Sequence, residues 1–147
     1  MKDTLRDQGK RKLLVQELQE KRGINNANVL KAIGAVPRHL FFDKVFHDNF
    51  AYKDVAFPIG AGQTISQPFT VATQSSLLKI EKGMKVLEVG TGSGYQTAVL
   101  LELGAKVYSI ERQRELFQSA KVNLSKLNYR ANLFFGDGYI GKEAFAP

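Results

Sequence analysis

The chain has 147 residues, 44% of them hydrophobic, which is enough for one domain with a buried core. It contains no cysteine, which excludes disulfides and thiolate metal sites, and no apolar run long enough to cross a membrane. The basic residues exceed the acidic ones by seven. The first residues also lack the apolar core of a secretion signal, so we expect a cytoplasmic protein without membrane contact.

Residues 1–55 are expected to be helical and irregular. A basic helix is predicted from Leu5 to Lys21, and a second, short helix from Asn28 to Ala35, which ends before Pro37. Three leucines form a narrow apolar seam on the first helix: Leu13, Leu14 and Leu18. We interpret its basic residues as a solvated face, and a nucleic-acid-binding patch is the weaker alternative.

An aromatic cluster follows the second helix and is expected to pack in the core or in a lid. Its members are Phe41, Phe42, Phe46, Phe50 and Tyr52. Nearby, His39 and His47 lack metal-ligand spacing to each other or to a third ligand, so we expect loop or surface histidines and no metal.

A segment punctuated by glycines, from Phe57 to Pro68, is expected to be a loop that runs into a helix starting at Pro68. Polar residues crowd the end of this loop: Gln63, Thr64, Ser66 and Gln67. Serine and threonine cap helices, but they also contact ligands. Composition alone does not choose between a capped connector and a ligand loop.

From Lys85 onward, β-forming and helical patterns alternate. Strands are predicted over 85–89, 106–110 and 131–135, and helices over 94–103 and 112–127. This alternation predicts an α/β fold with a parallel sheet, right-handed crossovers and flanking helices. We expect a single domain over 1–147, consisting of a helical region (1–55), a loop and helix (56–79) and a βαβαβ core (80–147).

The first predicted strand ends in a glycine-rich turn, Gly90-Thr91-Gly92-Ser93-Gly94. No Lys-Ser or Lys-Thr follows, which excludes a Walker loop, and the G-x-G-x-G spacing departs from the G-x-G-x-x-G of dinucleotide folds. With Glu88 inside the strand, the stretch resembles the first motif of Rossmann-like methyltransferases that use S-adenosylmethionine (AdoMet). A turn that binds NAD, or nothing, is the less favoured alternative.

Glu111 ends the second predicted strand, about 20 residues beyond Gly90. A carboxylate at this place can accept hydrogen bonds from both hydroxyls of a ribose. It can also act as an N-cap-like acid for the helix expected near Arg112. The two roles are compatible.

Several motifs together resemble the protein-L-isoaspartate O-methyltransferase family. Gly62-Gln63-Thr64-Ile65-Ser66-Gln67-Pro68 is similar to its signature loop, and this loop separates the family from other methyltransferases. Val36-Pro37-Arg38 with Phe41 resembles its upstream segment, and Gly136-Asp137-Gly138-Tyr139 its turn after the third strand. The likeness runs from about Leu30 to Gly141.

The resemblance implies transfer of a methyl group from AdoMet to the carboxylate of isoaspartyl residues in damaged proteins, without a metal and with S-adenosyl-L-homocysteine as product. It makes Ser66 the active-site residue. It also implies the following cofactor-binding residues: Thr64, Ile65, Glu88, Gly90, Thr91, Gly92, Ser93, Gly94, Glu111, Arg112, Asp137 and Gly138. A histidine that some members carry after the loop's proline is absent, since Phe69, Thr70 and Val71 stand there.

The resemblance further implies a sheet with more strands, whereas the sequence given stops at Pro147. We therefore expect the C-terminal strands of the methyltransferase sheet to be missing, with an open edge that favours pairing with another chain. Two alternatives remain beside an isoaspartyl methyltransferase. One is a catalytically incompetent AdoMet-binding fragment, and the other, disfavoured by the signature loop, is a methyltransferase acting on nucleic acid.

Overall fold

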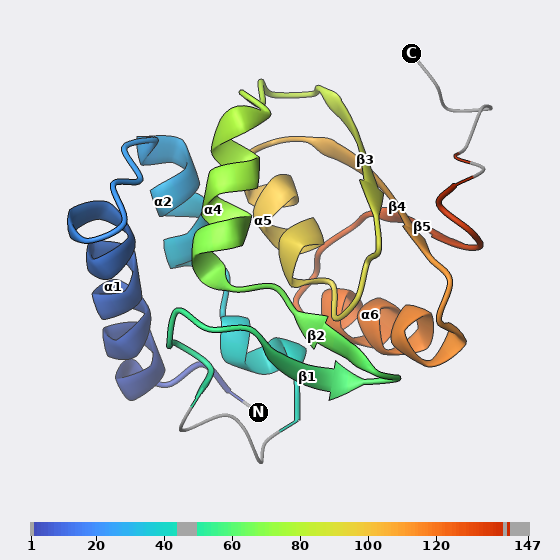
Figure 1. Cartoon of the computed structure of the whole chain (residues 1–147), viewed down its shortest axis with the longest axis horizontal. Coiled ribbons are helices and arrows are strands. Elements are labelled where there is room, and N and C mark those ends of the chain that lie inside the picture. The colour runs from blue at the N-terminus through green and yellow to red at the C-terminus, as the bar shows by residue number, and fades with distance from the viewer. Residues whose placement is uncertain (1, 44–49, 140, 142–147) are drawn as a thin grey trace.

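The structure is a computed structural model that describes residues 2–43, 50–139 and 141 (Figure 1). Its N-terminal region contains α1 (Leu5–Glu20), α2 (Ala27–Ala35) and the short 3-10 helix η1 (Arg38–Phe41). A capping box between Thr4 and Asp7 begins α1, and the Asn26 side chain accepts a hydrogen bond from Val29 N to begin α2. Both predicted helices are confirmed, with bounds within a residue of those expected.

The segment predicted as a loop is a β-hairpin, which corrects that prediction. β1 (Phe57–Gly60) and β2 (Gln63–Ile65) pair antiparallel. Gly60, Ala61 and Gly62 all have positive φ angles at the turn, of 101°, 48° and 66°. The glycines therefore make a tight reversal between two short strands. Periodicity cannot reveal strands of three and four residues, one of which contains Pro58.

The remaining elements follow the predicted alternation. They are α4 (Pro68–Leu77), β3 (Lys85–Val89), α5 (Tyr95–Glu102), β4 (Lys106–Glu111), α6 (Arg114–Lys126) and β5 (Asn132–Phe135). Pro68 occupies the start of α4, as expected. The strands are parallel in the order β3-β4-β5, with Val86 opposite Val107 and Ser109 opposite Leu133. In Figure 1, α1 and α2 lie beside α4 on the side of the molecule away from this sheet.

One core joins the N-terminal helices to the hairpin, α4 and α5. Leu14 and Leu18 are buried in it as predicted, but Leu13 is 66% exposed and does not belong to the apolar seam. Within the described residues, the aromatic cluster supplies packing through Phe41 and Phe42 and a hydrogen-bonding hydroxyl at Tyr52. Phe41 is buried, and the ring of Phe42 lies edge-on to Phe57 with centroids 4.6 Å apart. Phe46 and His47 lie outside the described residues.

His39 is fully buried, so the expectation of a loop or surface histidine is wrong for this residue. Its Nδ1 lies 2.6 Å from the Tyr52 hydroxyl, and its Nε2 lies 3.8 Å from Asp7. Asp3, Asp7 and His39 each place a ligand-type atom within 4.8 Å of the others. Both carboxylates already have partners, since Asp3 pairs with Arg11 and Asp7 belongs to the capping box. We interpret the group as a polar cluster, with Asp7 and His39 buried, that fastens η1 to α1.

The sheet leaves apolar surface uncovered on β3. Among the described residues, β3 pairs only with β4, and Leu87 and Val89 are 52% and 62% exposed. Such an edge favours pairing with further strands, although self-association stays a prediction. No helix in the described part of the chain has the length and apolar character needed to span a bilayer.

Candidate functional site

The glycine turn, residues 90–94, follows β3 directly. Gly90, Gly92 and Gly94 have φ angles of 87°, 56° and 89°. Residues other than glycine rarely adopt this region of backbone conformation. Gly90 N donates to Ile110 O at 2.8 Å, and Gly94 N donates to Thr91 O at 2.9 Å. The turn is thus fixed to the end of β4 before α5 begins at Tyr95.

A cavity of about 250 Å³ lies beside this turn. Its lining comes from the hairpin, the glycine turn, the end of β4 and the turn after β5: Gln63, Thr64, Val89, Gly90, Gly92, Ile110, Glu111, Arg112, Leu116, Asp137 and Gly138. A second cavity, of about 50 Å³, shares Thr64, Gly90 and Gly92 with the first. It is completed by Ile65, Ser66, Val71, Thr91, Ser93, Tyr95 and Gln96.

These two cavities bring together residues that are far apart in the sequence. Ser66 and the glycine turn line one cavity, whereas Glu111, Arg112, Asp137 and Gly138 line the other. Of the residues predicted to bind a cofactor, Gly94 and Glu88 line neither. Gly94 instead packs against α6, where Leu124 Cγ would lie 3.1 Å from a Cβ added to the glycine.

Glu111 is 4% exposed and holds two backbone segments at once. Its Oε2 accepts a hydrogen bond from Gly92 N at 2.9 Å, and its Oε1 accepts one from Gln113 N at 2.8 Å. Gln113 is the N-cap residue of α6 and makes no capping bond with its own side chain. The cap-like role that the sequence allows for Glu111 is therefore present, and the same carboxylate forms part of the cavity wall.

Glu88 lies on the helix-covered side of the sheet. Its Oε2 accepts hydrogen bonds from Thr97 on α5, at 2.5 Å, and from Ser109 on β4, at 2.6 Å. The Ser109 and Thr91 hydroxyl oxygens are 2.6 Å apart. Because Ser109 gives its only proton to Glu88, Thr91 is the donor of that pair. Glu88 is therefore connected to the glycine turn through Ser109 and Thr91. It acts from the helix-covered side of the sheet and lines neither cavity.

Burial raises the pKa of Glu88 to about 7, against an ordinary value of 4.5, and Glu111 nearby acts in the same direction. The hydroxyls of Ser109 and Thr97 partly offset this rise. Between pH 4.5 and 7 the folded protein keeps a proton that the unfolded chain releases. Stability should therefore fall as the pH rises through this window and level off above it.

We expect wild-type protein to lose about 2 kcal/mol of unfolding free energy between about pH 5 and about pH 8 through this one group. Glu88→Gln keeps an oxygen that accepts from the two hydroxyls and removes the charge, so it should lack this loss. Urea unfolding at a series of pH values measures both proteins. Parallel stability curves for the two would contradict the raised pKa.

Arg38, the last residue of the Val36-Pro37-Arg38 motif, is a buried cation. It is fully buried, with its guanidinium carbon 4.6 Å from the ring centroid of Tyr95 and 5.7 Å from that of Phe57. Burial lowers the pKa of Arg38, and Tyr95 offsets part of this effect. The residue therefore joins η1 to the first residues of β1 and α5. Nothing in the sequence pattern distinguishes it from a surface arginine.

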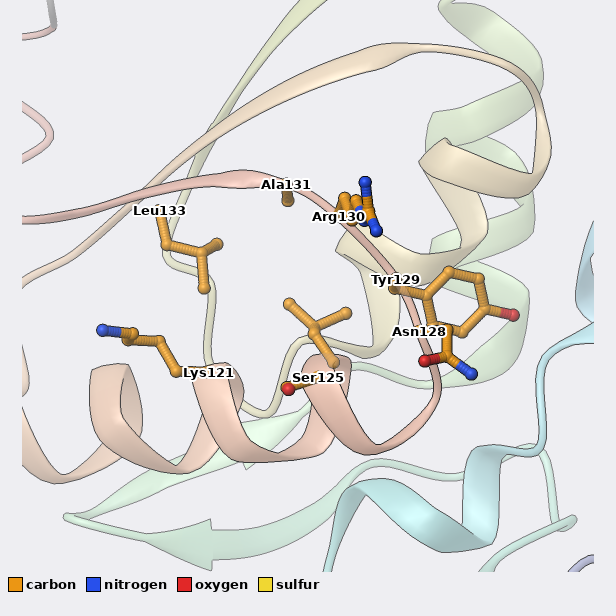
Figure 2. Close-up of a pocket in the computed structure, with 8 residues that line it drawn as sticks. Lys121, Ser125, Asn128, Tyr129, Arg130, Ala131 and Leu133 are labelled. Carbon is orange, nitrogen blue, oxygen red and sulfur yellow. The ribbon is translucent and has the colours of Figure 1, made fainter.

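A larger cavity, of about 490 Å³, lies elsewhere (Figure 2). It is lined by the C-terminal half of α6 and the connection into β5: Lys121, Leu124, Ser125, Asn128, Tyr129, Arg130, Ala131 and Leu133. Lys121 and Arg130 are exposed, and none of the predicted site residues contributes to this cavity. Convergence of polar groups from separate motifs, and not volume, identifies the smaller cavity as the candidate site.

Comparison with known proteins identifies a family for the chain. The family model described as protein-L-isoaspartate(D-aspartate) O-methyltransferase matches residues 9–147. Curated proteins named protein-L-isoaspartate O-methyltransferase from Christiangramia forsetii and Flavobacterium psychrophilum are 66% and 61% identical to the whole chain. The chain spans 68% of the length of each of these relatives.

Solved structures give the same result. A protein-L-isoaspartate O-methyltransferase matches 93% of this chain with a TM-score of 0.81 and 33% identity, and the match covers 45% of that protein. A Plasmodium falciparum protein, solved in complex with S-adenosyl-L-homocysteine, matches 86% of this chain with a TM-score of 0.68 and 25% identity, and the match covers 62% of that protein. The chain therefore belongs to the protein-L-isoaspartate O-methyltransferase family.

Proposed function

We propose that this chain binds AdoMet between the hairpin and the glycine turn and directs methyl transfer to the carboxylate of isoaspartyl residues in damaged proteins. The observation that carries the proposal is the pair of adjoining cavities. They join Ser66 of the signature loop to Gly90 and Glu111 of the βαβ unit. The chain covers only part of the length of its relatives, so the activity of this chain is the point to be tested.

The described residues fit the cofactor. A Cβ added at Gly90 would meet no atom within 4 Å, so it would extend into open space where both cavities meet. Glycine there leaves room for a ligand against the main chain. Glu111 presents a carboxylate in the same wall, and Asp137 lies in the turn opposite. The two cavities together approach the lower bound of about 300 Å³ for small-molecule sites.

In this assignment the glycine turn holds the methionine end, Glu111 the ribose, and Asp137 with Gly138 the adenine. AdoMet supplies a methyl group on a sulfonium centre and leaves as S-adenosyl-L-homocysteine. The accepting carboxylate is ionised at neutral pH and needs no general base. The chain's task is therefore to align the carboxylate and to exclude water. We assign Ser66 a hydrogen bond that orients this carboxylate.

A labelled-methyl assay tests the function directly. We expect transfer from AdoMet to a peptide containing one isoaspartyl residue, and none to the same peptide with a normal aspartate. Cofactor binding without transfer would support the alternative of an incompetent AdoMet-binding fragment. Transfer to DNA or RNA in place of the peptide would support the nucleic-acid alternative. Isothermal titration with S-adenosyl-L-homocysteine measures binding independently of transfer.

Ser66→Ala should lower turnover by about tenfold and leave AdoMet affinity unchanged within about threefold, because one orienting hydrogen bond is lost. Ser76→Ala is the matched control. It removes a hydroxyl that donates to Ala72 O within α4, and Ser76 lines neither cavity. Steady-state rates at saturating peptide and cofactor distinguish the two variants. Wild-type turnover in Ser66→Ala would exclude the orienting role.

A further inference from the structure

The Ser66 hydroxyl lies at an exposed position, and within the part of the chain that the structure describes it makes no hydrogen bond. Its placement therefore depends on its two neighbours. Ile65 on one side is buried, with 3% of its surface exposed, and belongs to the core. Gln67 on the other side is only partly buried, so a different contact must fix it.

That contact is Asp54, whose side chain is 3% exposed. Gln67 Nε2 donates hydrogen bonds to Asp54 Oδ2 and to the Asp54 carbonyl oxygen, both at 3.0 Å. The Gln67 side chain is thus held at two points by one residue. Because Gln67 directly follows Ser66, this arrangement limits how far the serine can move.

Asp54 also fixes the start of α4. Its Oδ1 accepts a hydrogen bond from Phe69 N at 2.8 Å. Gln67 is the N-cap residue of this helix and makes no capping bond with its own side chain, so Asp54 supplies the cap from a distant part of the chain. The helix start and the residue beside Ser66 are therefore held by the same carboxylate.

A cation from the N-terminal region completes this arrangement. Arg22, two residues after α1, places Nη2 2.8 Å from Asp54 Oδ2. The guanidinium carbon of Arg22 lies 5.4 Å from the ring centroid of Phe69. The buried charge of Asp54 is thus paired as well as hydrogen-bonded, which is the condition for keeping a carboxylate out of water.

We propose that Asp54 is a positioning residue for Ser66, and that Arg22 links this residue to the N-terminal helices. The claim rests on the proposed function for the role of Ser66. Asp54 lines neither cavity and contacts no expected ligand position. Its effect should therefore appear in turnover and in the mobility of residues 62–67, and not in cofactor affinity.

The test compares Asp54→Asn with Asp3→Asn in the full chain. The amide of Asp54→Asn keeps one oxygen for Phe69 N but turns donors toward Gln67 and Arg22. The helix cap is therefore retained, whereas Gln67 keeps only its hydrogen bond to the carbonyl oxygen of residue 54. Asp3→Asn makes the same chemical change in an ion pair with Arg11 on the N-terminal region. It controls for a general loss of stability.

Hydrogen exchange followed by mass spectrometry should show at least about tenfold faster exchange over residues 62–67 in Asp54→Asn, with β3 and β4 unchanged. Turnover should fall at least about tenfold at saturating substrates, with less than about threefold change in the dissociation constant for S-adenosyl-L-homocysteine. Unchanged exchange over 62–67, or an equal fall in turnover in Asp3→Asn, would overturn the proposal. If the wild type transfers no methyl group, the proposed function fails, and the exchange result still decides whether Asp54 fixes the segment.

Discussion

Gly94→Ala should destabilise the protein by about 3 kcal/mol, because it combines backbone strain with a clash in the core. Gly94 has a φ of 89°, where a side chain costs about 1–2 kcal/mol. The added Cβ would also lie 3.1 Å from Leu124 Cγ and 3.6 Å from Ala120 Cβ. Both neighbours are buried on α6, so the Leu124 side chain would have to give way by a few tenths of an ångström inside the core. Denaturant unfolding measures the effect.

Two other glycines provide matched controls for this prediction. Gly9 lies inside α1 with no atom within 4 Å of an added Cβ, so Gly9→Ala should stabilise the helix by about 0.5–1 kcal/mol. Gly90 has a φ of 87° and open space around it, so Gly90→Ala should cost only the backbone strain. Equal destabilisation by the Gly90 and Gly94 substitutions would show that packing against α6 contributes nothing.

Glu111→Gln should weaken AdoMet binding by about a hundredfold, which corresponds to about 3 kcal/mol. The carboxylate accepts from Gly92 N and Gln113 N, and an amide would turn a donor toward one of these N–H groups. The glycine turn would then be less firmly held at the point where the cofactor is expected. The proposed charged hydrogen bonds to the ribose would be lost as well. Isothermal titration with AdoMet measures the change.

Glu102→Gln is the matched control for Glu111→Gln. Glu102 accepts one hydrogen bond from the Tyr129 hydroxyl at an exposed place and lines neither cavity of the candidate site. Its substitution should leave the affinity for AdoMet within about threefold of the wild type. If Glu111→Gln bound AdoMet with wild-type affinity, the proposed contact between Glu111 and the ribose would be excluded. The assignment of the ribose to this wall of the cavity would then be excluded as well.

The parallel core could be predicted because its local signals agree. β-branched runs, three glycines at one turn and helical periodicity all favour the same βαβ order, and the observed bounds of β3 and β4 lie within a residue of those expected. The helix predicted from residue 112 begins at Arg114, because Glu111 and Gln113 form its cap. Boundaries of this kind depend on side-chain contacts that periodicity does not record.

The parts that could not be predicted depend on tertiary contacts. His39 resembles a surface residue in the sequence, yet α1 and Tyr52 enclose it. The resemblance places Glu88 among the cofactor-binding residues, and the structure adds that the alternation along β3 turns its side chain toward Thr97 and Ser109. Asp54 precedes the hairpin by a few residues and has no motif of its own, so only the folded chain shows that it holds Gln67. The carboxylates of Glu88 and Glu111 differ in role because one faces the helices and the other the cavity.

The end of β4 combines main-chain and side-chain anchoring in a single residue. The Glu111 carbonyl oxygen accepts from Gly136 N at 3.0 Å, just before the Asp137-Gly138 turn, while its carboxylate reaches Gly92 and Gln113. Three connections that are separate in the sequence thus share one fastening point. If the tip of β4 moved, the glycine turn and the Asp137-Gly138 turn would move with it, because both are bonded to Glu111. The distance between these two walls of the cavity should therefore stay constant even when the surrounding loops shift.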